Sequence, residues 1–596
     1  MRRVSMMARV KRSIFTSLIT ILILPAANVC GAGEELPSAT EWIPAEAAIV
    51  LEIPDSSKVV EGLLSKEFEG RIRENEQIRQ FLESPQFAQI VGIVRYLEFR
   101  LGTDWKDAVR KLFGGRITAA LLPRNQVLIV VDTKSAELLS KLHQVLLEHA
   151  RDEAQKAGDP DRVASGVYKG WTGWTFDGGK NVHALVGSRL LLSNKADLLR
   201  SAADLAETGG AGSLARVAAY QQAQAALPQN AWVRAFVNIG LIKEAPRSDR
   251  IERAMRTNPL LALMVADNLE ALSNATWMAA AINVDGGRVG LHVVADGTFP
   301  GGDHPTAFSL PTNESGCLRN IEVPRRLVAV SLYRDLARFY RQKDVLFPER
   351  TSGLIFFENM MGVFFTGRHF SEEVLPHLHP EIRLVVAAQE YQPDYGVPAV
   401  ALPAMALVFR MKDPKQFVPM AEEAWQKALG LINFTRGQQA LPGLILDRAE
   451  YRGVRYTVAA FSTVGLTPED RKDVRFNFRP VLAPVGEYLV LSSTEQLARD
   501  IIDYLQQEDQ NAARLPGRHF VLETDREGLL KLLKTNREAI IRQNMVERGH
   551  SREKAEAETN NLFALVAILG ELRVELLRQE DKPQARIEVA LPGTEN

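Results

Sequence analysis

Residues Val485–Ser492 read VGEYLVLS, and a near copy, VGSRLLLS, lies earlier in the chain at Val186–Ser193. An ungapped match of residues 186–205 with residues 485–504 has eight identical residues in twenty, far more than unrelated segments share. In both stretches a glycine stands between two apolar runs, which is the pattern of a tight turn between two strands. The repeat predicts a duplicated chain.

Further landmarks recur in the same order on both sides of a turn-rich stretch at residues 297–322. The chain of 596 residues also exceeds the roughly 250–300 residues at which a single core stops growing. We therefore predict a first copy at residues 40–296, a linker at 297–322 and a second copy at 323–592. The matched landmarks are Pro44 with Pro324, Gly115-Arg116 with Gly367-Arg368, and Tyr168-Lys169-Gly170 with Tyr451-Arg452-Gly453.

The apolar patterns predict strands in groups of two and three between helices. In the first copy they predict a hairpin at 117–131, a helix at 135–150, strands at 167–176, 182–186 and 189–193, and a hairpin at 276–294. A doubly wound parallel fold would instead need strict alternation of strand and helix. The sequence therefore favours an α+β fold, in which largely antiparallel sheets pack against helices.

Residues 1–32 have the pattern of an export signal. An apolar run at 14–24 follows a basic start, and small residues follow at Cys30–Ala32. The run has eleven residues, well short of the roughly 20 that span a bilayer. We expect cleavage near Ala32 and a mature protein in the periplasm or outside the cell, although an uncleaved signal would tether it to the membrane. The basic residues are Arg2, Arg3, Arg9, Lys11 and Arg12.

Removing residues 1–32 takes five positive charges from a chain whose net charge is −1, which leaves about −6. A negative chain gives no support to nucleic-acid binding. Cys317 is the single cysteine after residue 32, so no intramolecular disulfide can form there. No later apolar run is long enough for a membrane span. The composition, 46% apolar and 24% charged, is that of a folded protein.

Three of the ten histidines lie within eleven residues, at His369, His377 and His379. On an extended segment His377 and His379 would point to one face. With His369 or Glu373 they would offer imidazole and carboxylate ligands for zinc. However, the spacing matches no metallohydrolase helix motif, prolines flank the pair, and the first copy lacks the segment. The same features fit a surface connection between a helix and a strand, so zinc binding is a hypothesis.

Trp171 and Trp174 are candidates for a stacking platform that would bind sugars or glycan strands. In a regular strand the two side chains would face opposite sides, so a platform needs a bulge, which Gly173 would permit. The alternative is cross-strand packing beside the core. The second copy has Val454 and Thr457 at the matching positions, which favours packing.

Other motifs have structural explanations. Gly210–Ala215 superficially matches a dinucleotide-binding fingerprint but follows a helix, so it predicts a loop. Ser551–Lys554 has the spacing of the serine and lysine of penicillin-recognising enzymes without their Lys-Thr-Gly element, so Ser551 is predicted to cap a helix. Ser493–Gln496 and Thr524–Glu527 both fit a capping box. The sequence contains none of the common signatures of serine hydrolases, zinc proteases, P-loop nucleotide binding or dithiol redox chemistry.

The export signal is followed by Ile43–Glu46 before the first strand, by Phe113–Arg116, and by Val-Gly-x-x-Leu-x-Leu-Ser before a helix. This order resembles a group of exported bacterial proteins classed as a domain of unknown function, over most of residues 40–592. The resemblance implies a location in the cell envelope. It carries no catalytic residues to transfer.

The sequence favours a non-enzymatic exported protein that binds a ligand or a protein partner of the bacterial envelope, in a cleft between two duplicated domains. One alternative is a metal-dependent hydrolase that uses His369, His377 and His379. Another is a cell-wall or surface structural component that uses Trp171 and Trp174. No cofactor other than zinc is indicated.

Overall fold

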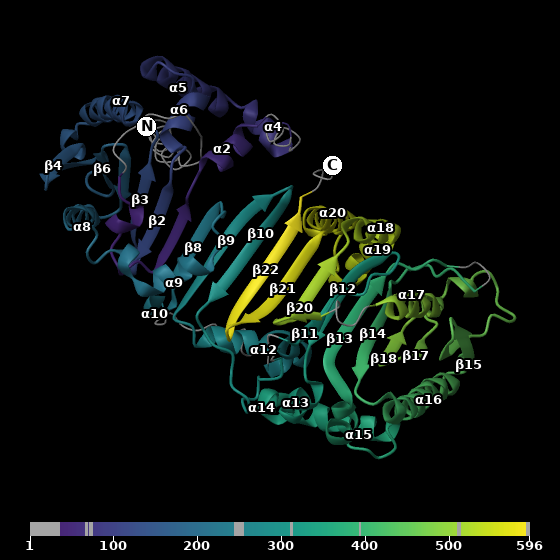
Figure 1. Ribbon diagram of the computed structural model, residues 1–596. Coiled ribbons are helices and arrows are strands. Elements are labelled where there is room, and N and C mark those ends of the chain that lie inside the picture. The colour runs from purple at the N-terminus through teal and green to yellow at the C-terminus, as the bar shows by residue number, and fades with distance from the viewer. Residues whose placement is uncertain are drawn as a thin grey trace. The chain divides into compact units, whose positions relative to one another are not determined.

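The computed structural model describes residues 36–65, 70, 76–242, 256–309, 311, 314–391, 395–508 and 514–591 (Figure 1). The predicted signal peptide at residues 1–32 lies outside the described residues. The described residues up to 242, together with 276–284, form one compact unit, and those of 256–275 and 285–591 form a second. Among the described residues, no helix combines the length and the apolar character that crossing a membrane requires.

The first unit contains an antiparallel sheet with the strand order β4-β5-β6-β7-β3-β2-β1-β8-β9. Strand β1 pairs with β2 on one side and with β8 on the other. The strands are β1 (Ile49–Ile53), β2 (Ile117–Leu122), β3 (Gln126–Asp132), β4 (Ala164–Tyr168), β5 (Trp171–Thr175), β6 (Val182–Val186), β7 (Arg189–Ser193), β8 (Val233–Asn238) and β9 (Trp277–Asp285).

The second unit contains an antiparallel sheet with the order β15-β16-β17-β18-β14-β13-β12-β20-β21, which continues through β22 to β10. Two short strands, β11 and β19, pair separately. The strands are β10 (Arg288–Ala295), β11 (Gly316–Leu318), β12 (Arg326–Tyr333), β13 (Leu378–Ala387), β14 (Ala404–Met411), β15 (Leu444–Tyr451), β16 (Val454–Phe461), β17 (Val481–Val485), β18 (Tyr488–Ser492), β19 (Arg514–Pro516), β20 (Arg518–Thr524), β21 (Leu572–Gln579) and β22 (Lys582–Ala590).

The two strand orders are the same when β1 is matched with β12 and the remaining strands follow in chain order with β19 left out, so that β8 matches β20 and β9 matches β21. The register also repeats. Trp174 lies opposite His183 across β5 and β6, and Thr457 lies opposite Leu482 at the equivalent place across β16 and β17. The α+β prediction with largely antiparallel sheets is therefore confirmed, and the repeated strand order agrees with the duplication inferred from the sequence.

The helices of the first unit fall mostly between β1 and β2 and after β3, β7 and β8. They are α2 (Ser57–Leu64), α4 (Glu76–Leu82), α5 (Pro85–Leu101), α6 (Trp105–Phe113), α7 (Ala136–Lys156), α8 (Ala196–Glu207), α9 (Ala218–Ala226) and α10 (Ile239–Ile242), with a 3-10 helix, η1 (Ala39–Trp42), before β1. Ser135 begins α7 by accepting a hydrogen bond from Leu138 N–H, so the helix predicted at 135–150 forms and extends to Lys156.

The helices of the second unit repeat part of this pattern, since α16 follows β14 as α7 follows β3, and α17 follows β18 as α8 follows β7. The helices are α12 (Pro259–Ser273), α13 (Leu336–Arg341), α14 (Lys343–Leu346), α15 (Thr351–Phe364), α16 (Pro414–Gln438), α17 (Glu495–Gln507), α18 (Arg526–Thr535), α19 (Arg537–Arg548) and α20 (Arg552–Leu569). Between α15 and β13 the chain forms a short π-helix, η6 (Phe370–Val374), and a 3-10 helix, η7 (Leu375–His377).

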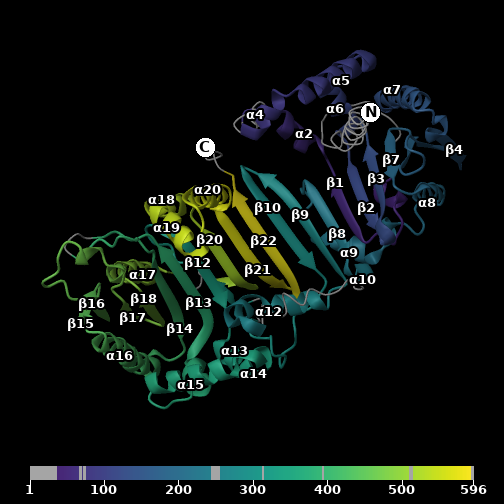
Figure 2. The same cartoon turned by 180° about the vertical axis from the view of Figure 1, so that it is seen from behind.

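Helices α16 and α17 lie on opposite sides of β17 and β18 (Figure 1, Figure 2). Alternate residues of these strands therefore enter two different cores. Val481, Ala483 and Val490 pack with Ile501 of α17, whereas Leu489 packs in the cluster that contains residues of α16. The repeated sequence motif thus supplies both faces of the hairpin with apolar side chains.

Three local predictions need correction. The strand predicted at 167–176 is two strands, β4 and β5, joined by a turn at Lys169-Gly170 in which both residues have positive φ. The helix after β18 is capped by Thr494 rather than Ser493, and the helix after β20 by Asp525 rather than Thr524. In each case the capping side chain stands one residue later than predicted, because the extended chain continues through the earlier one. Ser551 caps α20, as predicted.

The turn glycine of the repeated motif gives a first test of the fold. Gly486 has φ +56°, and no heavy atom lies within 4 Å of the position that a Cβ would take, so the requirement for glycine is purely one of backbone conformation. Gly486→Ala should lower the free energy of unfolding by about 1 kcal/mol, measured by urea denaturation.

The control for this variant is Gly430→Ala. Gly430 is an exposed glycine inside α16 with equal space around it, and alanine there should stabilise the protein by about 0.5–1 kcal/mol. Equal effects at the two positions would contradict the assigned turn.

Candidate ligand-binding site

A hollow of about 510 Å³ lies in the first unit between α8 and the sheet formed by β4, β5 and β6. We call it the α8 hollow. Its volume falls within the range of roughly 300–1,000 Å³ that small-molecule sites occupy. Six of its lining residues are glycine or alanine, so the space arises from short side chains on both the strands and the helix. These are Ala164, Gly166, Gly173, Ala184, Ala196 and Ala203.

Trp171 forms an aromatic wall of the α8 hollow, and its ring packs against a second aromatic residue. Its ring lies 4.9 Å from that of Trp42 in η1. Trp42 in turn lies under the guanidinium of Arg189, 4.2 Å from the ring centre, and Arg189 pairs with Asp132 at 2.6 Å. Arg189 is buried, so this cation-π contact is shielded from water. The wall is therefore a rigid surface against which a flat ligand can pack.

Trp174 borders the α8 hollow but packs its ring elsewhere. The ring contacts His143 of α7, at 5.4 Å between centroids, and lies beside the guanidinium of Arg151. Because Trp171 and Trp174 are three residues apart on one regular strand, they face opposite sides of the sheet, as the sequence predicts for an unbulged strand. The two tryptophans do not form one platform.

The face of β5 that carries Trp174 holds a partly buried histidine pair. His143 Nε2 and His183 Nε2 are 3.1 Å apart. Burial lowers the pKa of His183 to about 4, and the neighbouring His143 adds to the effect, while Asp177 opposes it. Burial, together with Arg151, lowers the pKa of His143 as well. Both imidazoles are therefore neutral at pH 7.

At the equivalent place in the second unit, large side chains fill the space beneath α17. Tyr456 of β16 is buried and packs with Val458, Ala483 and Ala498 in one core cluster. Its hydroxyl donates to Glu495 at 2.7 Å. The phenol and the carboxylate together occupy the space between the sheet and the helix.

The residues that open the α8 hollow correspond to the ones that fill its counterpart. Trp174 matches Thr457 by strand register, so Gly173 matches Tyr456. In the helices, Ala196 and Glu495 occupy the same position of the aligned 186–205 and 485–504 segments. A Cβ added to Gly173 would meet no atom closer than Gly166 O at 3.8 Å, so the backbone there leaves room for a side chain.

The contacts between the strand turn and the following helix are alike in the two units, although the side chains between helix and sheet differ. Tyr168 donates its hydroxyl to Asp204 of α8 at 3.0 Å, and Lys169 pairs with the same carboxylate at 2.6 Å. In the second unit Tyr451 donates to Asp503 of α17 at 3.0 Å, and Arg452 pairs with it at 2.9 Å. The same tie therefore holds the strand turn to the helix in both units. It adds to the packing of the buried face of α8, which includes Leu198 and Ala202.

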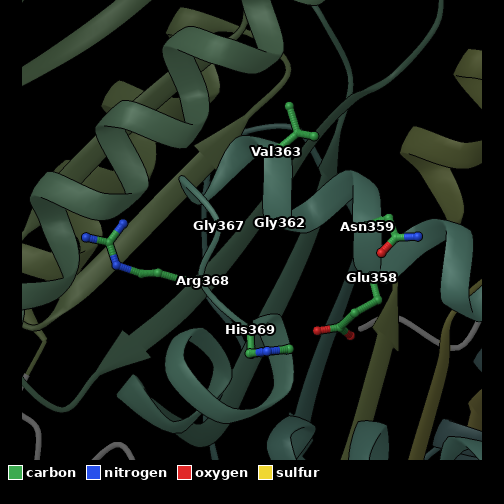
Figure 3. A pocket seen from close by; sticks show the side chains of 7 residues that line it. All are labelled: Glu358, Asn359, Gly362, Val363, Gly367, Arg368 and His369. Atoms are coloured by element: carbon green, nitrogen blue, oxygen red, sulfur yellow. The ribbon is translucent and has the colours of Figure 1, made fainter.

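A second hollow, of about 440 Å³, lies in the second unit at the end of α15 (Figure 3). His369 and Glu358 both line it, and Arg368 points away from them in Figure 3. Glu358 accepts a hydrogen bond from Phe370 N–H at 2.9 Å, and Glu373 accepts one from His369 N–H at 2.8 Å. Both carboxylates thus stabilise the start of the π-helix η6, a conformation that is rare outside such local constraints.

The structure places the three predicted histidines in different surroundings. His377 ends η7, and its ring stacks on Phe417 of α16 at 6.1 Å. His379 lies in β13, where burial lowers its pKa. The extended segment expected for the pair begins only at Leu378. Within the described part of the chain, no three histidine, cysteine, aspartate or glutamate side chains form a group that could hold a metal ion.

Sequence reasoning identifies Trp171 but misses Gly173, Ala196 and Arg200, a cation that also lines the α8 hollow. A glycine and an alanine have no chemistry of their own. The signal that reveals them is comparative, since only the second copy shows that a tyrosine and a glutamate stand at these positions.

No family model and no curated protein matches the chain. Among solved structures it is similar to the protein TP0453. Crystal form I has 11% sequence identity and a TM-score of 0.22, with 46% of this chain and 82% of that chain covered. Crystal form III has 10% identity and a TM-score of 0.23, with 46% and 84% covered. Similarity at this level supports no inference about fold or function.

The neutral histidine pair predicts a pH dependence of stability. In the unfolded chain His183 binds a proton below pH 6.5, whereas in the folded protein it does so only near pH 4, so stability falls as the pH drops between these values. Between pH 7 and pH 5 this residue should remove about 2 kcal/mol from the free energy of unfolding. His183→Leu, which installs the residue of the second copy, should flatten this part of the urea-denaturation profile. An unchanged slope in the variant would show that folding does not lower the pKa of His183.

Zinc analysis tests the metal hypothesis. Because the three histidines do not converge, we expect atomic emission to find well below one equivalent of zinc in the purified protein. The zinc content of the double variant His377→Ala/His379→Ala should be the same as that of the wild type. One equivalent of zinc that is lost in the double variant would instead support the hydrolase alternative.

Proposed function

We propose that this chain is an exported, non-enzymatic protein of the bacterial envelope that binds a small ligand, and that the α8 hollow of the first unit is its binding site. The export pattern at residues 1–32 supports the location. The ligand-binding part of the proposal rests on one observation: two units with the same strand order differ in that one has a hollow where the other has Tyr456 and Glu495.

Protein interiors are normally packed as tightly as organic crystals, and a void costs stability. Replacing a buried aromatic side chain by a small one typically costs about 3–5 kcal/mol. The first unit nevertheless combines a glycine with an alanine at the two matched positions and joins the strand turn to the helix through the Tyr168 and Lys169 contacts. A preformed hollow of this kind is what a ligand site requires.

The lining suits binding better than catalysis. The side chains around the α8 hollow are mainly apolar, with Trp171, Val182 and Leu199 among the larger ones. The charged lining residue is Arg200, and the hydroxyl groups belong to Ser165, Tyr168 and Thr175. These lining side chains do not include a histidine, cysteine or carboxylate placed to activate a nucleophile.

Filling the hollow with the residues of the second unit provides the test. The variant Gly173→Tyr/Ala196→Glu should raise the free energy of unfolding by about 0.5–2 kcal/mol, because it packs an aromatic ring into an existing hollow between α8 and the sheet. It should also lose binding of small probes. Isothermal titration calorimetry with p-cresol, indole, hexanoate and 4-hydroxyphenylacetate gives the affinity of each.

The matched control is Thr172→Arg, which also installs a second-unit residue, the counterpart of Arg455, but on the other face of β5. It should bind probes as the wild type does. If the wild type binds none of the four probes, or if the filled variant binds them equally well, the α8 hollow is not the site.

A further inference from the structure

The side chains beneath α17 in the second unit indicate which chemical groups would fit the α8 hollow of the first unit. Beneath α17 the Tyr456 hydroxyl donates to Glu495 and accepts from Arg499 Nε at 3.0 Å, and Arg499 Nη2 lies 2.6 Å from the same Glu495 carboxylate. The set at this place is thus an aromatic ring joined through a hydrogen bond to a carboxylate, which the partly exposed Arg499 and, at 2.9 Å, Arg479 both contact.

The first unit keeps the guanidinium of this set and lacks the other two groups. Arg200 stands at the position of Arg499 in the aligned segments, one helical turn after Ala196. It lines the α8 hollow, and one of its nitrogens contacts the exposed carboxylate of Asp197 at 3.1 Å. A guanidinium has five donor hydrogens, so one weak surface pair leaves most of its capacity for a second carboxylate.

The other charges near the rim are one lysine and two carboxylates, which together carry a net charge of −1. Lys169 pairs with Asp204 at 2.6 Å and with Glu207 at 2.5 Å. These contacts raise the pKa of Lys169, and the contact with Lys169 lowers that of Asp204, so this lysine and this aspartate are both ionised at pH 7 and Lys169 is occupied by carboxylates of the protein itself. Among the described side chains that line the hollow, Arg200 is therefore the cation that a ligand can reach.

We propose that the α8 hollow binds a small aromatic acid, with its ring against Trp171 in the space that Tyr456 fills in the second unit, and its carboxylate on Arg200. This inference rests on the function proposed above and narrows it to a ligand class. The ring buries apolar surface against a wall held rigid by Trp42, and the fixed wall costs no ordering on binding. The carboxylate replaces Glu495 as the partner of the helix arginine.

The test uses three probes that share one ring. 4-Hydroxyphenylacetate carries the carboxylate, p-cresol is neutral, and tyramine is a cation. Calorimetric titration of the mature protein should show the acid binding about two- to fivefold more tightly than p-cresol, with tyramine weakest. Hexanoate, which has the charge without the ring, should also bind more weakly than the aromatic acid.

Two variants of Arg200 separate charge from packing. Arg200→Gln should reduce the ratio of the acid's affinity to that of p-cresol to about one, whereas Arg200→Lys should retain part of the preference for the acid. If p-cresol and the acid bind equally, or if the preference survives in Arg200→Gln, the aromatic-acid assignment is wrong while the α8 hollow stands as a binding site. If no probe binds in a manner sensitive to the filled variant, both proposals fall.

Discussion

The tie between a strand turn and a helix is the constraint on which both units depend. In each unit a tyrosine and a basic residue of the β4-β5 or β15-β16 turn bind one aspartate of the helix that follows the repeated hairpin. These contacts join the turn to the helix at the exposed rim in both units. The side chains between helix and sheet differ between the units, and they decide whether the space there is filled or open.

The same frame therefore allows two outcomes. In the second unit Tyr456, Glu495 and Arg499 form a hydrogen-bonded set within a continuous core, and their contribution is to stability. In the first unit Gly173 and Ala196 stand where the second unit has the ring and the carboxylate, Arg200 matches Arg499, and Trp171, which has no aromatic counterpart in the second unit, forms one wall. The proposed ligand would supply an aromatic ring and a carboxylate where the second unit has those of Tyr456 and Glu495.

Much of the fold is predictable from local pattern. Periodicity and turn chemistry indicate the glycine turn of Val485–Ser492, the first hairpin and the helix beginning at Ser135, and the structure forms them. The predictions that need correction depend on single-residue detail. The turn at Lys169-Gly170 resembles part of a strand because lysine rarely adopts positive φ. The caps at Thr494 and Asp525 are easily placed one residue early because neighbouring residues in each segment carry equally suitable side chains.

The candidate site is predictable only in part. Trp171 is noticeable in the sequence because tryptophan is large and rare. The hollow beside it is bordered by residues with little or no side chain. Such a space can be recognised only when the side chains of several segments distant in sequence are placed together.

The most direct measurement is a crystal structure of the mature protein soaked with 4-hydroxyphenylacetate. We expect density for one molecule between α8 and β5, with its ring on Trp171 and its carboxylate at Arg200. An empty α8 hollow at a saturating concentration, or a helix α8 collapsed onto the sheet so that no hollow exists, would contradict the proposed site.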